Sequence, residues 1–511
     1  MIDVQSLVEG FFLIFTLEGI LCLLLGMAWG IVAGAIPGMT GTMATIILLP
    51  VTFSFETMNA MIMLTACYVG SVYAGSITAI LYNCPGDPSS ACTAFDGYPM
   101  AKKGLANEAQ GLSLSASALG GWASYVVMLL FMKPIADFAL RFGAPEMFML
   151  AMFGMAVVAS IGSDSIFKGV LMALFGLLLG TLGIAPTGSL RGTFGIPYLM
   201  DGIPFVSALI GLFAFTELFD LITREYVMED DHQGESGSVL AQNKFTVKRV
   251  FKGMLQTFSY RATLIRGWLI GTLVGALPAA GSSVASLISY TQSKQYSKNG
   301  KEFGTGHPEG VVASESANNA STGGAMMTSF TIGIPGSATT AILLAALMMH
   351  GLNPGPRLFN EHMPMVYGLT LCVIIGNIVM LCEGSFFAYL FSLTMKIRTM
   401  YLVPIITLFC VIGSYSIGAT LYDVIIMICF GVLGVLFKRN GYPSIAIVLG
   451  MILGPIADGN LIRTAMTYNG NFSVLFTSPI CIFLLLLALC SVVVPLVLAR
   501  NKTISQLKID D

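Results

Sequence analysis

The chain of 511 residues contains 25 Lys and Arg and 27 Asp and Glu, and 55% of its residues are hydrophobic. Charged residues make up 10% of the chain, whereas a soluble globular protein has about 25%. This excludes a soluble domain, which needs more polar surface, and a disordered chain, which needs fewer apolar residues. The net charge of −2 and the lack of a basic domain argue against a nucleic-acid partner. We therefore expect an all-α polytopic membrane protein.

Apolar stretches recur along the chain in two series, and many are long enough to cross a bilayer. Their number predicts roughly 10–14 membrane segments, some of them short or broken. One charged stretch, with the sequence REYVMEDDHQGESGS, separates the two series. The predicted organisation is a first transmembrane repeat over 1–222, a cytoplasmic linker over 223–263, a second repeat over 264–474, and a terminal membrane helix with a cytoplasmic tail over 475–511.

Three short motifs of the first series recur in the second series in the same order. They are GAIPGMTG at 34–41 and GALPAAGS at 275–282, CPGD at 84–87 and IPGS at 334–337, and IGSDSI at 161–166 and IGSYSI at 412–417. Internal repeats of this length are typical of secondary transporters. We expect two structural repeats that contain broken or re-entrant helices.

The distribution of Lys and Arg predicts how the two repeats are oriented. If the linker and the C-terminus lie in the cytoplasm, the pair Lys102 and Lys103 also lies inside. The first-half loops that then fall outside carry few basic residues, which predicts two halves of opposite topology. One cluster disagrees, because Lys294, Lys298 and Lys301 would fall outside.

Breaks of the Pro-Gly type inside apolar sequence are the strongest local signal. Proline removes a backbone donor and glycine permits unusual dihedral angles, so protein, water or a solute must satisfy the freed backbone groups. Small polar residues follow these breaks, and the N-terminus of a half-helix suits a carboxylate. We expect a mid-membrane substrate site that contains Pro37, Gly38, Thr40, Gly41, Pro85, Gly86, Asp87, Ser282, Ser283, Asn318, Asn319, Pro335, Gly336 and Ser337.

A cation site is expected just before the last break. Glu315 and Asn319 are one helical turn apart and can share a face, with Asn318 beside them. A carboxylate, amide oxygens and freed carbonyls are hard oxygen ligands, which suit sodium better than a proton. The alternative is that these residues form a hydrated loop end. We predict sodium as the coupling ion, with a proton as the alternative, and no cofactor.

Enzyme signatures are missing from the sequence. It contains no glycine-rich loop ending in Lys-Ser or Lys-Thr, no HExxH and no GxSxG. The energy for transport is therefore expected from an ion gradient or from another subunit. An intramembrane enzyme is the rival class, but it would need a catalytic dyad or a metal cluster that the sequence does not contain.

Two long motifs resemble those of the large membrane subunit of the tripartite tricarboxylate transporters, the TctA family. The first, from Tyr68 to Gly104, reads YVGSVYAGSITAILYNCPGDPSSACTAFDGYPMAKKG, and the second, from Phe303 to Pro356, contains HPEGVVASESANNASTGG. The chain departs from the family at Ala279 and Thr40, where the family often has glycine.

The resemblance implies a multi-pass protein of the bacterial inner membrane. It also implies two partners, a small four-helix membrane subunit and a periplasmic solute-binding protein that delivers the substrate. The implied activity is the import of a di- or tricarboxylate, such as citrate, by cation symport. Another organic anion, such as an aromatic carboxylate, remains the alternative substrate for the same machinery.

Overall fold

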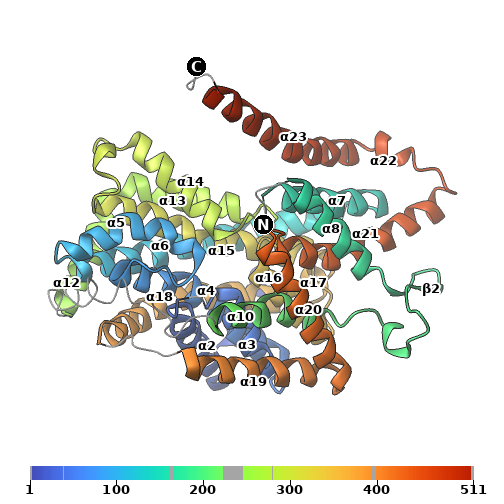
Figure 1. Cartoon of the computed structure of the whole chain (residues 1–511), viewed down its shortest axis with the longest axis horizontal. Coiled ribbons are helices and arrows are strands. Elements are labelled where there is room, and N and C mark those ends of the chain that lie inside the picture. Colours follow the sequence, from blue (N-terminus) through green and yellow to red (C-terminus); the bar gives the residue numbers. More distant parts are fainter. Residues whose placement is uncertain are drawn as a thin grey trace.

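The computed structural model describes residues 3–37, 39–161, 166–222, 245–278, 280–393 and 399–507. Nearly all elements in these ranges are helices, which confirms the predicted all-α class (Figure 1). Six helices of the described part are long and apolar enough to cross a membrane. A short antiparallel hairpin pairs β1 (Gly183–Ile184) with β2 (Leu190–Arg191). The chain is therefore a multi-pass membrane protein.

The first half consists of one amphipathic helix followed by membrane helices of unequal length. Its helices are α1 (Val4–Ile14), α2 (Leu17–Gly34), α3 (Gly41–Thr52), α4 (Thr57–Tyr82), η1 (Pro88–Ser90), α5 (Ala91–Lys102), α6 (Ala106–Ala139), α7 (Ala144–Ile161), α8 (Ile166–Gly180), η2 (Pro197–Leu199), α9 (Phe205–Leu209), η3 (Ile210–Phe215) and α10 (Thr216–Ile222).

The second half begins with another amphipathic helix and repeats the pattern of short and long helices. Its helices are α12 (Val247–Gln256), η5 (Thr257–Tyr260), α13 (Arg261–Gly275), α14 (Gly281–Tyr296), η6 (Gly300–Glu302), α15 (Pro308–Ile332), α16 (Ala338–Met349), α17 (Pro356–Glu361), α18 (Met363–Leu393), α19 (Thr399–Gly418), α20 (Leu421–Arg439), α21 (Ser444–Thr467), α22 (Val474–Thr477) and α23 (Pro479–Leu507). Helices α22 and α23 run along α7 at the rim of the molecule (Figure 1).

The predicted helix breaks are confirmed at all four motifs. Helix α2 ends at Gly34 and α3 begins at Gly41, so the chain leaves the helical conformation between them. In the same way, α13 ends at Gly275 and α14 begins at Gly281. Helix α4 ends at Asn83 and α15 ends at Gly333, both in the left-handed conformation, with φ of 55° and 83°. Glycine adopts this conformation freely and asparagine tolerates it better than most residues, so both stop a helix sharply.

The two halves repeat one helix crossing in detail. A Cβ atom on Gly30 of α2 would lie 2.3 Å from the carbonyl oxygen of Cys67 on α4. A Cβ atom on Gly271 of α13 would lie 2.4 Å from the carbonyl oxygen of Ala317 on α15. Only glycine permits such close backbone approach in a membrane, where small residues drive helix packing. The same contact at corresponding positions supports an internal repeat, while the inverted orientation of the halves stays a prediction.

Helices of one half pack directly against helices of the other half. Helix α1 packs against α18 of the second half, and α12 packs against α6 of the first half. Helix α8 contacts α21, and α20 contacts η3. This reciprocal contact joins the two halves into one interlocked body.

The linker predicted over 223–263 is only partly described, because residues 223–244 lie outside the described ranges. Its remaining part forms α12, η5 and the start of α13. Arg249 on α12 forms an ion pair of 2.7 Å with Glu108 on α6. The second part of the linker is thus a packed helix, and the domain boundaries themselves stay a prediction.

The structure removes the exception to the charge distribution. Lys103, at the end of α5, donates a hydrogen bond of 2.7 Å to the carbonyl oxygen of Thr305, in the loop between α14 and α15. Lys298 and Lys301 belong to the same loop and therefore lie at the same end of the molecule as Lys102 and Lys103. The expectation that these lysines fall on opposite sides is wrong, because α14 and α5 end side by side.

Candidate functional site

The four helix breaks meet at one cavity of about 360 Å³. The N-terminal residues of α3, η1, α14 and α16 form its polar wall, so both halves contribute two helix starts each. Six of the predicted substrate residues line this cavity: Thr40, Gly41, Asp87, Ser282, Ser283 and Ser337.

The Pro and Gly residues of the breaks support the cavity from behind rather than lining it. A Cβ atom on Gly86 would lie 2.1 Å from the carbonyl oxygen of Gly34, and a Cβ atom on Gly336 would lie 2.5 Å from that of Gly275. These two glycines thus let the breaks of each half touch. Predicted residues outside the lining are Pro37, Pro85, Gly86, Asn318, Asn319, Pro335 and Gly336, and Gly38 lies outside the described residues.

Side chains cap the two helix starts contributed by the first half. Thr40 Oγ1 accepts a hydrogen bond of 3.3 Å from the Met43 amide at the start of α3. The Asp87 carboxylate accepts one bond of 3.2 Å from the Gly41 amide and another of 2.9 Å from the Ser89 amide. A carboxylate at a helix start satisfies free N–H groups and the helix dipole. The first half of the cavity is therefore already supplied with an anion.

The two helix starts from the second half differ from each other. Ser337 and Thr340 form a reciprocal capping box at the start of α16, and the Ser337 hydroxyl also lies 3.2 Å from the Tyr68 hydroxyl. By contrast, no side-chain hydrogen bond caps the start of α14 among the described residues. The first N–H groups of a helix carry partial positive charge. Gly281 to Ser283 are thus the part of the cavity best suited to an anion.

Hydroxyl groups join the halves across the cavity. Thr42 Oγ1 lies 3.0 Å from Thr339 Oγ1, which links α3 to α16. Ser321 Oγ, on α15, donates a bond of 2.7 Å to Ser282 Oγ, which links the cavity wall to the helix that carries the predicted cation residues. A ligand in the cavity can therefore influence both halves.

Four wall residues outside the break motifs were missed by the sequence reasoning: Tyr68, Val72, Phe213 and Ile445. Tyr68 begins the first family-like motif and its hydroxyl was an available signal, but other polar residues of α4, such as Thr65 and Ser71, gave the same signal without lining the cavity. Phe213 and Ile445 lie in apolar helices and are indistinguishable there from their neighbours.

Glu315 is fully buried between the halves and does not line the cavity. Its carboxylate accepts a hydrogen bond from Thr93 on α5 and one of 2.7 Å from Ser117 on α6. No Lys, Arg or His of the described part forms an ion pair with it. A buried carboxylate without a cation is costly, so this position needs a proton or a bound cation.

Asn318 and Asn319 point toward α4 rather than into the cavity. The Asn318 side-chain amide donates a bond of 3.1 Å to the Val72 carbonyl, and that of Asn319 donates one of 3.4 Å to the Val69 carbonyl. Both residues are fully buried, and within the described ranges their side-chain oxygens accept no hydrogen bond. Unpaired buried oxygens are rare and need an explanation. Two neutral oxygens near a buried carboxylate fit a sodium ion chemically.

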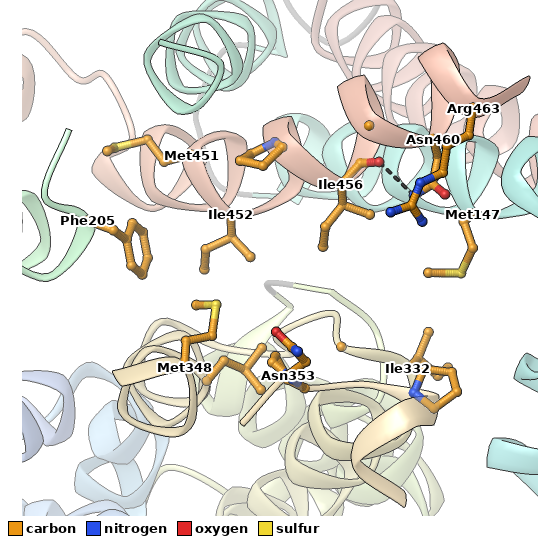
Figure 2. A pocket seen from close by; sticks show the side chains of 16 residues that line it. Met147, Phe205, Ile332, Met348, Asn353, Met451, Ile452, Ile456, Asn460 and Arg463 are labelled. Atoms are coloured by element: carbon orange, nitrogen blue, oxygen red, sulfur yellow. Dashed lines mark hydrogen bonds between the residues drawn. The ribbon is translucent and has the colours of Figure 1, made fainter. Parts of the chain in front are cut away.

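A second, more apolar cavity of about 460 Å³ lies farther along two of the same helices. Figure 2 shows Met451 and Ile452 of α21 facing Met348 of α16 across it. Arg463 lies at one end of this cavity beside Asn460, and among the described residues it is the only charged one in the lining. Because α16 and α21 begin at the first cavity and continue along the second, the two cavities lie one after the other along this helix pair.

Among the described residues, no group of three His, Cys, Asp or Glu side chains could hold a metal ion. The site that the structure offers is instead built from helix starts, hydroxyl groups and amide oxygens. Such groups bind and orient an anion or an alkali cation without supplying a nucleophile and base pair.

Comparison with known proteins gives a consistent result. Residues 20–449 match the model of the family described as "Tripartite tricarboxylate transporter TctA family". The chain is 35% identical over 494 residues to an uncharacterized 52.8 kDa protein in the TAR-I ttuC' 3' region of Agrobacterium vitis, which covers 96% of each chain. An uncharacterized protein in the TAR-II ttuC' 3' region of the same organism is 33% identical over 241 residues, 47% of this chain and 100% of that protein. No solved structure matches the chain.

Proposed function

This chain belongs to the tripartite tricarboxylate transporter TctA family, and we propose that it imports a di- or tricarboxylate by cation symport across the bacterial inner membrane. The observation that carries the proposal is that four helix starts, two from each half, converge on one cavity. Broken helices that meet at a repeat interface are the usual architecture of a substrate site in a secondary transporter.

The substrate carboxylates bind on the second-half side of the cavity. The uncapped start of α14 offers the amides of Gly281, Ser282 and Ser283, and helix starts stabilise anions without a formal positive charge. The Ser337 hydroxyl on the neighbouring helix start adds a donor. The Asp87 carboxylate repels the substrate carboxylates from the first-half side of the cavity and so orients them toward α14.

A cation must accompany the substrate. Moving one negative charge inward against 100 mV costs about 2.3 kcal/mol, so a trianion such as citrate costs roughly 7 kcal/mol. We assign sodium to the oxygens of Glu315, Asn318 and Asn319. Their helix, α15, contacts the cavity through the bond from Ser321 to Ser282, which couples ion binding to substrate binding. A proton on Glu315 is the alternative coupling ion.

The second cavity serves as the access path. Its apolar walls hold a carboxylate weakly, while Arg463 at the outer end attracts it. Family membership further supports two partners, a small four-helix membrane subunit and a periplasmic binding protein that delivers the carboxylate. Two interlocked halves around a central site then alternate access by moving one part against another.

The test is uptake of labelled citrate into vesicles that contain the chain, its small membrane partner and the binding protein. Sodium and pH gradients are imposed separately. We expect accumulation driven by an inward sodium gradient at constant pH. Uptake without the binding protein, or no uptake under any gradient, would contradict the proposal.

Aromatic carboxylates are the second candidate substrates, because the Tyr68 and Phe213 rings line the cavity. Unlabelled citrate and benzoate are therefore compared as competitors in the same assay. Stronger competition by benzoate would assign the site to aromatic carboxylates without changing the transport mechanism.

A further inference from the structure

A separate basic pocket lies where η5 and the start of α13 approach the end of α14 and the start of α15. It has a volume of about 350 Å³ and lies between the start of α13 and the end of α14. Its lining includes Arg261, Arg266 and Lys298 together with the hydroxyls of Tyr260 and Ser297. None of these residues belongs to the two cavities described above.

The pocket carries a net positive charge. Within the described ranges, no carboxylate forms an ion pair with Arg261, Arg266 or Lys298. Arg261 Nε donates only to the Phe258 carbonyl, at 3.1 Å, and the Arg266 guanidinium lies 5.7 Å from the centre of the Tyr296 ring. These contacts orient the two guanidinium groups without neutralising them.

One acidic side chain lines the pocket, and its hydrogen bonds are already used. Glu309 is 8% exposed and accepts bonds of 2.5 Å from Thr263 Oγ1 and 2.6 Å from Ser297 Oγ. Glu302 lies nearby but contacts His307, with 3.7 Å between a Glu302 carboxylate oxygen and His307 Nε2. Three cations facing one buried carboxylate favour an anionic ligand.

An apolar stripe leads away from the pocket along α13. Ala262 lines the pocket, and Ile265, Leu269 and Leu273 follow at helical spacing on the same face. Their side chains are 50%, 43% and 69% exposed. In a membrane protein we expect such an exposed apolar face to lie against lipid chains, and here it would do so next to the cationic groups. A soluble anion would use only the pocket, whereas a phospholipid matches both features.

We propose that this pocket binds the headgroup of an anionic phospholipid, with its acyl chains along α13. The guanidinium groups of Arg261 and Arg266 hold the phosphate, and Lys298 adds a third positive charge. The basic residues gathered at this end also indicate the cytoplasmic leaflet, which is the side where Lys and Arg accumulate. This lipid site is separate from the proposed substrate site, and a lipid bound there would hold α13 and α14 in position relative to each other.

Lipid binding to the purified full chain in detergent tests the proposal, by native mass spectrometry with phosphatidylglycerol and with phosphatidylcholine. We expect retention of phosphatidylglycerol in preference to phosphatidylcholine. The triple variant Arg261→Gln/Arg266→Gln/Lys298→Gln should weaken this retention at least about tenfold. The double variant Arg261→Lys/Arg266→Lys keeps the charge and should retain the lipid, which separates loss of charge from loss of folding.

Arg357→Gln is the matched control, because Arg357 is an exposed cation on α17 outside the pocket. Its lipid retention should equal that of the wild-type chain. Equal retention of the two lipids, or unchanged retention in the triple Gln variant, would overturn the proposal. Displacement of phosphatidylglycerol by millimolar inorganic phosphate would overturn it too, because the pocket would then be a site for a soluble anion.

Discussion

The break regions of the two halves share one scaffold but differ in charge. Gly86 packs on Gly34 in the first half just as Gly336 packs on Gly275 in the second. The next residue differs, because Asp87 follows Gly86, whereas Ser337 follows Gly336. Repetition therefore provides the broken-helix geometry, and we propose that this single difference between the repeats decides which side of the cavity accepts an anion.

The long helices that precede the breaks, α4 and α15, also differ in the polar groups that they carry. Glu315 and Asn319 of α15 stand where α4 has Thr65 and Val69, at the same separation that relates Gly336 to Gly86. The Asn319 amide even bonds to the carbonyl of Val69, its counterpart in the other half. The candidate cation ligands thus belong to one half only, which makes a nearly symmetric scaffold asymmetric in function.

The largest expected effect comes from removing the shared scaffold. Gly86→Ala and Gly336→Ala each place a methyl group against a backbone carbonyl, at 2.1 Å and 2.5 Å. Such overpacking costs about 1–3 kcal/mol and displaces the helix starts, so uptake should fall at least about tenfold. Vesicle uptake of labelled citrate measures this, with folding of the detergent-purified variants checked by size-exclusion chromatography.

Gly376→Ala is the control for these two variants. A methyl group there meets only the flexible side-chain ends of Leu23 and Met27, at 3.3 Å, and its uptake should stay near the wild-type rate. If Gly86→Ala and Gly336→Ala both transport normally, the breaks do not form the substrate site.

A charge placed on the second-half side should remove the difference between the halves. Ser337→Asp keeps a good helix cap but gives this half the carboxylate that the first half already has. Because Ser337 is proposed to donate a hydrogen bond to the substrate, a carboxylate in its place would lie beside the bound anion and repel it. KM for citrate should therefore rise at least about tenfold, which corresponds to about 1.4 kcal/mol.

Ser337→Asn separates charge from capping in the same experiment, because asparagine caps a helix equally well and is neutral. Its KM should stay within about threefold of the wild-type value. Equal KM values for the Asp and Asn variants would mean that the anion does not bind beside α16.

The cation ligands of α15 give a third, ion-specific effect. Asn319→Ala removes an unpaired buried oxygen, and we expect the sodium concentration for half-maximal uptake to rise at least about tenfold. Capture of citrate by the binding protein alone should not change. Asn377→Ala on α18 is the matched control, since it removes another buried amide whose oxygen has no partner in the described part. Uptake that follows a pH gradient without sodium would exclude the sodium assignment.

The breaks could be predicted from sequence because their cause is local. A proline or glycine changes its own backbone, and the polar residues that cap a helix follow at fixed spacing, as for Thr40 and Ser337. The direction of Asn318 and Asn319 could not be predicted. Which face of a buried helix meets a neighbour depends on tertiary packing, and here both amides meet carbonyls of α4.

The second cavity was also beyond the reach of the sequence. Its walls are ordinary apolar residues of helices that are distant along the chain, such as Met348 and Met451. Arg463 belongs to no recognisable motif, and its sequence neighbours do not distinguish it from other basic residues near helix ends. The fold class followed from composition and periodicity, whereas this path depends on how α21 lies over α16.

The smallest expected effect tests whether the second cavity leads to the asymmetric site. Arg463→Gln removes the only charge that the described residues place in the lining of that cavity, and it touches neither half-site. Because the group is exposed, it attracts the substrate from solution rather than binding it tightly. At low ionic strength KM for citrate should rise about threefold, with kcat unchanged. Above roughly 0.3 M salt the difference should nearly vanish, since screening shortens the reach of the charge to a few ångströms.

Arg463→Lys keeps the charge and should behave as the wild-type chain at both salt concentrations. A KM effect that is independent of salt would instead place Arg463 in direct contact with bound substrate, and the access path between α16 and α21 would then be part of the binding site.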